Sequence, residues 1–150
     1  MVKMTLTLLL GLCAACVPAG SVRAAETAST QSAPMRVVFH LDTDSKGTVT
    51  AMHQVRNLLT ADPTAKIVVV ALGESVRFLV KGSKTEGGYP FALMIEDLQQ
   101  SGVRFEACNN TMTTLKITKN QLDDDIDVVP SGLAEIARLQ SREGYAYIKP

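Results

Sequence analysis

Short apolar runs and stretches with helical periodicity alternate along the chain from about residue 35 to its end. Between the runs, apolar residues recur three or four positions apart, most clearly from Phe91 to Leu98. The alternation predicts an α/β domain, a three-layer sandwich with a mostly parallel sheet of about five strands and helices on both faces. A flavodoxin-like strand order is the default for such a domain. The runs that predict strands span residues 36–41, 66–72, 103–107, 126–130 and 145–149.

Two segments in the middle of the chain depart from this regular alternation. Residues 74–81 fit a short helix, although their apolar positions would suit a strand almost as well. Residues 81–90 contain three glycines and a proline, which predicts a loop. This loop is long enough to serve as a lid over a neighbouring site.

The first 25 residues have the pattern of a secretory signal peptide. Lys3 precedes an apolar run at 4–17, and small residues follow it up to residue 25. The run is short for a bilayer span, so we expect cleavage near residue 25 and a periplasmic or secreted protein that no longer contacts the membrane. A lipoprotein signal with Cys16 as the lipidated residue is the alternative. Residues 26–34 are small and polar, which predicts a flexible linker before a folded domain at 35–150.

Charge and motif content argue against several classes of function. The chain has 15 basic and 15 acidic residues, and a near-neutral surface provides no electrostatic reason to bind nucleic acid. One cysteine outside the leader, two histidines and scattered carboxylates show no metal-ligand spacing. The turn after the first strand is too acidic for a flavin phosphate, and no G-x-G-x-x-G or G-x-S-x-G motif occurs. We therefore expect neither a metal nor a cofactor.

The cysteines direct attention to one position. Cys13 and Cys16 form a C-x-x-C pair, but both lie in the leader, so only Cys108 remains in the exported chain. A single cysteine cannot form a disulfide within its own domain. Cys108 is therefore buried, reactive or paired between chains.

Polar and reactive side chains follow the predicted strands at their carboxyl ends, where open parallel sheets place their functional sites. His40 and Asp42 follow the first strand, Gly73 the second, and Cys108 and Asn109 the third. A flavodoxin-like order makes the first and third strands neighbours and would bring Cys108 within reach of the His40 and Asp42 region. A thiol where a strand meets a helix lies near backbone N–H groups that favour its thiolate. The alternatives are a space-filling buried cysteine and a hydrogen-bonded core histidine.

Several segments together resemble the DsrE/DsrF-like family, in its small single-domain branch. They include VVFHLDTD, KIVVVALGESVRFLV and, as the most specific part, GVRFEACNNT at 102–111. The resemblance covers residues 36–150 and implies a DsrEFH-like α/β fold, assembly into trimers or hexamers, and a candidate active-site cysteine at Cys108. The better-understood relatives pass a persulfide between cysteines in intracellular sulfur relay, whereas other members lack the cysteine.

These observations favour an exported sulfur-handling protein, a possible sulfurtransferase or sulfur carrier in which Cys108 accepts sulfane sulfur from a donor protein and passes it on. Asn109, Asn110 and backbone N–H groups would stabilise the anion, and His40 would assist proton transfer. One alternative is a non-enzymatic oligomeric module that binds a small anion or a protein and keeps Cys108 buried. Another is a redox sensor that dimerises through Cys108.

Overall fold

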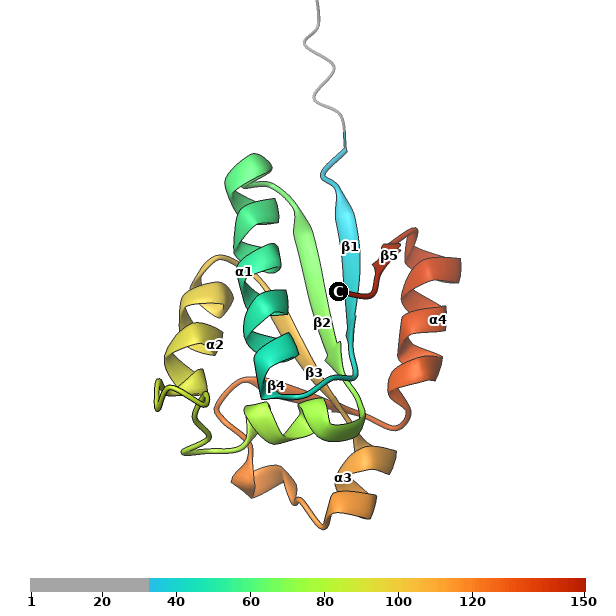
Figure 1. Ribbon diagram of the computed structural model, residues 1–150. Coiled ribbons are helices and arrows are strands. Elements are labelled where there is room, and N and C mark those ends of the chain that lie inside the picture. Colours follow the sequence, from blue (N-terminus) through green and yellow to red (C-terminus); the bar gives the residue numbers. More distant parts are fainter. Residues whose placement is uncertain (1–32) are drawn as a thin grey trace, which may run out of the picture. The chain divides into compact units, whose positions relative to one another are not determined.

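The computed structural model describes residues 33–150, which form one compact unit of alternating strands and helices (Figure 1). The predicted signal peptide at 1–25 and most of the predicted linker lie outside the described residues. No helix in the part of the chain that is described has the length and apolar character needed to cross a membrane. In chain order the elements are β1 (Arg36–Leu41), α1 (Ser45–Ala61), β2 (Lys66–Ala71), the 3-10 helix η1 (Gly73–Leu79), α2 (Phe91–Gln100), β3 (Arg104–Cys108), α3 (Asn109–Leu115), the 3-10 helix η2 (Lys119–Gln121), β4 (Ile126–Val129), α4 (Gly132–Glu143) and β5 (Ala146–Ile148).

The predicted α/β class and the sheet of five parallel strands are confirmed, but the predicted strand order is wrong. The order is β4-β3-β2-β1-β5, so β2 lies between β1 and β3, whereas a flavodoxin-like order would make β1 and β3 neighbours. With right-handed crossovers, the face on which each connection packs determines the side on which the next strand is added. The connections that follow β1, β2 and β3 each add the next strand on the same side, and only α4 brings the chain back to place β5 beside β1.

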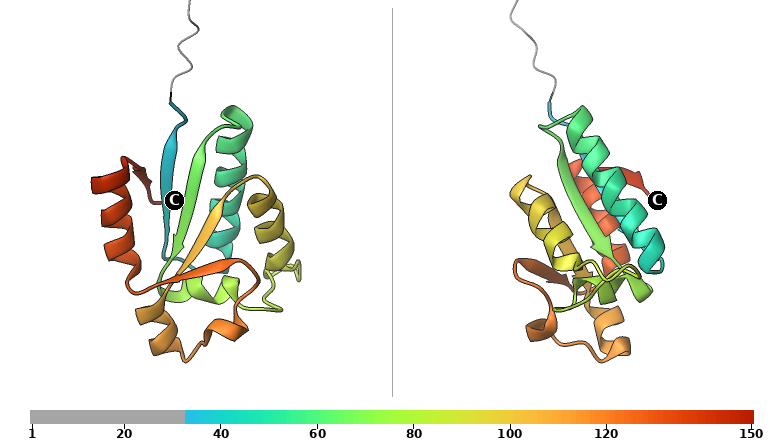
Figure 2. Two further views of the ribbon diagram at one scale, coloured as in Figure 1. Left: turned by 180° about the vertical axis from the view of Figure 1, so that it is seen from behind. Right: turned by 60° about the vertical axis from the view of Figure 1, so that its left-hand side comes forward.

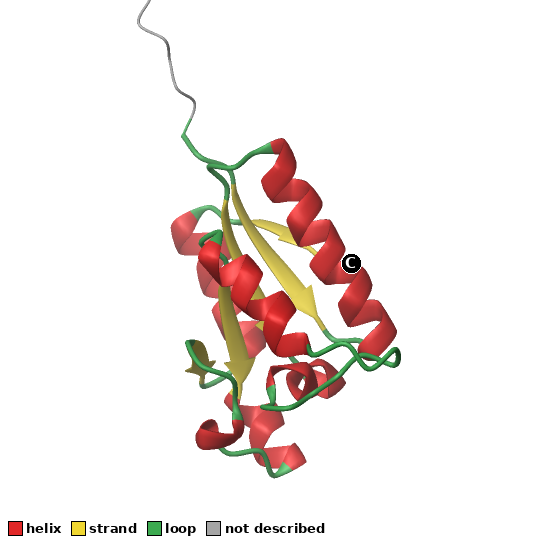
Figure 3. Ribbon diagram, turned by 90° about the vertical axis from the view of Figure 1, so that its left-hand side faces the viewer, coloured by secondary structure: helices red, strands yellow, loops and turns green. Residues whose placement is uncertain are grey.

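The two faces of the sheet are covered unequally. The larger core lies on the face that packs against α1, α2 and η1, and Figure 3 shows the strands from the side with the long helix α1 along them. On the opposite face α4 lies near β1 and β5 (Figure 2). The apolar core on that face is small and consists of Val38, Val68, Val70, Ile136 and Leu139.

The three central strands explain the continuous apolar runs in the sequence. In β1, β2 and β3 the first residue is exposed and every later residue is buried, because helices cover both faces of the sheet. Two of these buried positions are polar, His40 in β1 and Glu106 in β3. The strand register aligns each of them with Val70 of β2, so they lie in one row across the sheet.

The segments with ambiguous patterns adopt compact local structures. The helix predicted at 74–81 is present as the 3-10 helix η1. The loop predicted at 81–90 contains an isolated antiparallel bridge between Lys84 and Pro90 and a turn in which the Gly88 N–H donates to the Thr85 carbonyl over 2.9 Å. The loop therefore folds back on itself beside α1 and α2.

Candidate active site at the carboxyl end of β3

Cys108 lies where the sequence places it, at the junction of a strand and a helix. It is the last residue of β3 and the N-cap residue of α3. It is a free cysteine and is 4% exposed. The register pairs it with Val129 of β4, and alternation along β3 places its side chain on the same face as Glu106. That face is the one covered by α4.

Hydrogen-bond donors surround the Cys108 sulfur and determine its charge state. Burial raises the pKa of the thiol, but hydrogen bonding from the backbone N–H groups of Gly132, Thr111 and Asn110 and from the Thr111 hydroxyl outweighs burial. The pKa of Cys108 is therefore lowered overall. These donors favour the thiolate because each N–H or O–H hydrogen interacts more strongly with a charged sulfur than with a neutral one.

Thr111 connects the sulfur to the end of the neighbouring strand. The Gly73 N–H donates to the Thr111 hydroxyl oxygen over 3.3 Å, which leaves the hydroxyl proton free to be donated to the Cys108 sulfur. Gly73 has a positive φ of 52°, and a Cβ at this position would lie 2.0 Å from the Asp42 carboxylate oxygen Oδ1. Only glycine therefore fits between Asp42 and Thr111.

Gly132 brings the first turn of α4 to the same sulfur. A Cβ on Gly132 would lie 2.8 Å from the Leu72 side chain, so the absence of a side chain lets the start of α4 approach the end of β2. The Ser131 hydroxyl accepts a hydrogen bond from the Ala134 N–H over 3.5 Å and caps the helix. The thiol therefore lies between residues that begin two different helices.

The predicted asparagines contribute less than expected. Asn109 and Asn110 are both exposed. Asn110 reaches the sulfur through its backbone N–H. The Asn109 carbonyl accepts a hydrogen bond from the Thr113 hydroxyl over 2.9 Å, within α3. The anion-stabilising groups are therefore mainly backbone N–H groups and the Thr111 hydroxyl.

His40 is not a neighbour of the thiol, and the predicted proximity is wrong because β2 separates β1 from β3. Its Nδ1 lies 2.8 Å from the hydroxyl of Tyr147 in β5, and its Nε2 is buried with no hydrogen-bond partner among the described residues. Burial and the nearby Lys149 lower the pKa of His40, and Asp42 opposes them. His40 is thus a neutral histidine at the β5 side of the sheet.

A hollow of about 320 Å³ lies beside two of the residues that donate hydrogen bonds to the Cys108 sulfur. Its wall includes Asn110 and Thr111, which both donate to Cys108, and it extends over Gly73 and Glu74. A larger cavity of about 720 Å³ lies between α1, α2 and the loop at 81–90, and none of the donors to the sulfur lines it. The small hollow, and not the larger cavity, therefore lies against two of the donors to the sulfur, although Cys108 itself does not line it.

Three residues of this site were not predicted from the sequence: Thr111 as a donor, Gly132, and Glu106. Thr111 and Gly132 show no local signal for this role, because the fold alone brings them to the sulfur. Glu106 had a signal, since alternation along VRFEAC places Glu106 and Cys108 on one face of the strand.

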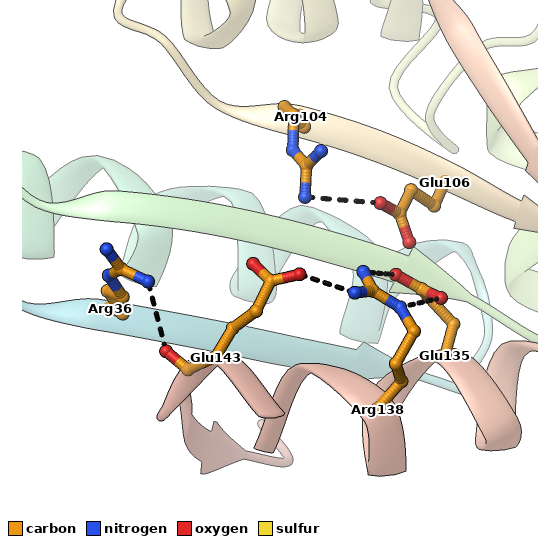
Figure 4. A network of polar contacts seen from close by, with 6 residues as sticks. All are labelled: Arg36, Arg104, Glu106, Glu135, Arg138 and Glu143. Atoms are coloured by element: carbon orange, nitrogen blue, oxygen red, sulfur yellow. Dashed lines mark hydrogen bonds and ion pairs between the residues drawn. The ribbon is translucent and has the colours of Figure 1, made fainter. Parts of the chain in front are cut away.

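Glu106 is 3% exposed, which is unusual for a carboxylate. Burial, Glu135 and Asp127 raise the pKa of Glu106 to about 7, against the opposing effects of Arg104 and Arg138. Figure 4 shows its carboxyl group on the side of β3 that faces Glu135 and Arg138 of α4. A second buried acid thus accompanies the thiol on the α4 face.

Known proteins match the described fold over most of its length. A model of the DsrE/DsrF-like family matches residues 21–150. The structure of MTH1491, a protein of unknown function from Methanobacterium thermoautotrophicum, is 35% identical and has a TM-score of 0.68, with 77% of this chain and 99% of that chain covered.

Two more distant structures share the fold. YchN from E. coli is 16% identical with a TM-score of 0.65, covering 79% of this chain and 100% of its own. BT1422 from Bacteroides thetaiotaomicron is 19% identical with a TM-score of 0.57, covering 77% of this chain and 94% of its own. No curated protein matches the chain.

Proposed function

This chain belongs to the DsrE/DsrF-like family, which is associated with sulfur relay, and we propose that Cys108 accepts sulfane sulfur as a persulfide and passes it on. The resemblance of residues 36–150 to this family is thereby confirmed. Family membership alone does not assign chemistry to a residue. The proposal therefore rests on the site around one sulfur atom.

The observation that carries the proposal is the set of donors around Cys108. Three backbone N–H groups and the Thr111 hydroxyl lower the pKa of a thiol that burial alone would raise. A thiolate is the form that attacks sulfur, and a thiolate is also the group that must leave when the sulfur is passed on. One set of donors therefore serves both directions of transfer.

The transfer is a pair of thiol exchange steps that balance without an external oxidant. The Cys108 thiolate attacks the outer sulfur of a donor persulfide, a bond forms between the two sulfur atoms, and the donor's own S–S bond breaks. The donor leaves as a thiolate, and Cys108 carries the persulfide. An acceptor thiolate then attacks the outer sulfur and releases the Cys108 thiolate.

Site access favours a narrow sulfur donor. The hollow beside Cys108 is lined by Gly73, Glu74, Asn110, Thr111, Thr114 and Leu115. A polysulfide chain or a persulfide on a flexible segment of a partner protein is narrow enough for such an approach, whereas a bulky rigid substrate is not. His40 takes no part in this proposal, since β2 separates it from the thiol.

The cellular setting is part of the same proposal. The leader at 1–25 would export the protein to the periplasm or the medium, where a donor or acceptor protein of that compartment would act with it. Assembly into a homo-oligomer, a trimer or a hexamer, is what the family resemblance implies. After cleavage the chain would have no membrane contact and no nucleic-acid partner.

Polysulfide labelling of the full chain tests the proposal. The protein is treated with polysulfide, then with a thiol-alkylating mass tag, and the peptide that contains Cys108 is analysed by mass spectrometry, which separates it from Cys13 and Cys16. We expect this peptide to gain one additional sulfur atom in the native protein, and to lose it on treatment with an acceptor thiol. The C108S variant is the control.

The alternative is a binding module in which Cys108 is structural, and the low exposure of the residue is the observation that favours it. This reading predicts that polysulfide and the tag reach Cys108 only after unfolding in denaturant. That result would overturn the transfer proposal. A dimer linked through Cys108 on non-reducing gels would instead support the redox sensor.

A further inference from the structure

Glu106 is a buried acid that the proposed transfer does not use. It lies in β3, in the interior of the sheet, and is 3% exposed. Its Oε2 is buried with no hydrogen-bond partner among the described residues, and its Oε1 lies 3.5 Å from Arg104. Most buried polar atoms in folded proteins have a hydrogen-bond partner, so this oxygen requires an explanation.

Glu106 and Cys108 share a strand, a face and a covering helix. Alternate residues of a strand point the same way and are roughly 7 Å apart. Helix α4 covers both, because the Gly132 N–H in its first turn donates to the sulfur while Glu135 and Arg138 in the following turns face Glu106. Both side chains are buried, so bulk water does not screen their charges from each other.

The charged groups around Glu106 nearly compensate each other. Arg104 comes from β3, Asp127 from the paired position of β4, and Glu135 and Arg138 from α4, while β2 contributes the apolar Val70. The Arg138 Nε donates to Glu135 over 2.8 Å, and Arg138 also pairs with Glu143 (Figure 4). Arg138, the α4 cation that acts on Glu106, is therefore already paired with Glu135 and Glu143.

The surroundings of the sulfur differ in kind. Val129 of β4 pairs with Cys108 in register, Gly132 of α4 donates to the sulfur, and neither residue is charged. The nearest acid on its own face of β3 is Glu106. A charge on Glu106 would therefore act on the thiolate through an interior with few competing charges.

We propose that Glu106 is a positioning residue for the Cys108 thiolate: the two buried acids share one negative charge, so a protonated Glu106 favours the thiolate and an ionised Glu106 disfavours it. Its role in sulfur transfer rests on the proposed function, whereas the coupling of the two acids does not. With Glu106 titrating near pH 7, the coupling acts across the neutral range.

The pH dependence of alkylation tests the coupling. A neutral alkylating reagent is added to the full chain, without any sulfur donor, and its reaction with the Cys108 peptide is followed by mass spectrometry. The wild type is compared with E106Q, E106D and D127N. D127N is the comparison variant, because Asp127 pairs with Glu106 in register and helps to raise its pKa, but its own side chain is exposed.

The alkylation rates of E106Q and the wild type should differ only at pH values above the pKa of Glu106. Below the pKa of Glu106 the wild type and E106Q react at the same rate, because Glu106 is protonated. Above it E106Q reacts faster by up to about tenfold, which corresponds to about one pKa unit of the thiol. E106D follows the wild-type curve. D127N keeps an ionisable Glu106, so its curve keeps the wild-type shape and moves slightly toward lower pH, because bulk water screens most of the charge of Asp127.

Two results would overturn the coupling. One is an E106Q curve that superimposes on the wild type at every pH, and the other is an E106Q curve displaced by the same factor at every pH, which indicates a structural effect. If E106Q does not fold, a difference in curve shape between E106D and the wild type counts against the coupling. Absence of a persulfide on Cys108 would contradict the proposed function and leave this measurement intact.

Discussion

Cys108 and Glu106 are two acids on one face of one strand, and their pKa values move in opposite directions. Their exposures are nearly equal, 4% and 3%. Burial raises the pKa of both groups, yet the pKa of the thiol is lowered overall and that of the carboxyl rises to about 7. Burial therefore does not decide the charge state at this face. The donors that reach each acid decide it.

Helix α4 covers both acids, but the groups that it presents to Cys108 differ from those that it presents to Glu106. The start of α4 presents the Gly132 N–H, which, like the other first N–H groups of a helix, has no partner within the helix and here donates to the sulfur. The next turns present Glu135 and Arg138, whose charges are already paired. A helix packed on a sheet thus stabilises an anion at its start and disfavours one a turn or two later.

The largest expected effect is on stability, in the variant E106Q. The pKa of Glu106 is raised from 4.5 to about 7 in the folded protein. The folded state therefore holds this proton more tightly, and the associated stability is complete below pH 4.5 and is lost as the pH rises through 7. Glutamine at position 106 cannot ionise, so the free energy of unfolding of E106Q should not show this decrease of about 3 kcal/mol.

Urea unfolding at about pH 5 and about pH 8.5 measures how the free energy of unfolding of each protein changes with pH. The free energy of unfolding of the wild type should fall more between these pH values than that of E106Q. D127N is the comparison variant: it removes one of the charges that raise the pKa of Glu106, so its free energy of unfolding should fall with pH slightly less than that of the wild type and more than that of E106Q. If the free energy of unfolding changed equally with pH in the wild type and in E106Q, Glu106 would be ionised and hydrogen-bonded in the folded protein.

A smaller effect is expected on the thiol side, in the variant T111V. Valine preserves the shape of threonine but removes the hydroxyl that accepts from Gly73 and donates to the sulfur. We expect the pKa of Cys108 to rise, since one of its donors is lost, and alkylation near neutral pH to slow about threefold. The pH profile of the alkylation rate measures the shift.

Thr113 provides the matched control for this variant. It is on the same helix, and its hydroxyl donates to the Asn109 carbonyl over 2.9 Å, outside the set of donors to the sulfur and outside the lining of the hollow. T113V should therefore alkylate like the wild type, and T111S should restore much of the wild-type rate. An unchanged rate in T111V would show that the backbone N–H groups alone hold the thiolate.

The comparison also shows which features the local pattern contains. The alternation in VRFEA predicts a strand at 103–107 with Cys108 directly after it, because period-two alternation is a local property of the chain. In the structure this strand is β3, shifted by one residue so that Cys108 is its last residue. The junction with a helix follows from the polar residues after Cys108. These local features are the ones confirmed in β3 and α3.

The strand order and the contacts between distant segments could not be predicted from local sequence patterns. The strand order depends on which face each crossover helix takes, and α1, η1 and α4 carry no sequence signal for that choice. The error in order produced the error about His40, which lies two strands from Cys108. Gly132 and Gly73 reach the sulfur or its neighbour Thr111 from distant parts of the sequence, so only the folded sheet identifies them.

The smallest effect is expected from H40Q, and it tests whether the thiol site is confined to β3 and its flanking helices. His40 hydrogen bonds to Tyr147, and β2 separates it from Cys108. Burial lowers the pKa of His40, so its contribution to stability is present above its ordinary pKa and is lost as the pH falls. H40Q should therefore alter acid stability while leaving the alkylation rate of Cys108 within about twofold of the wild type, as expected for well-separated sites. Slower alkylation in H40Q, with the fold intact by circular dichroism, would show that the imidazole reaches the thiol despite the strand between them.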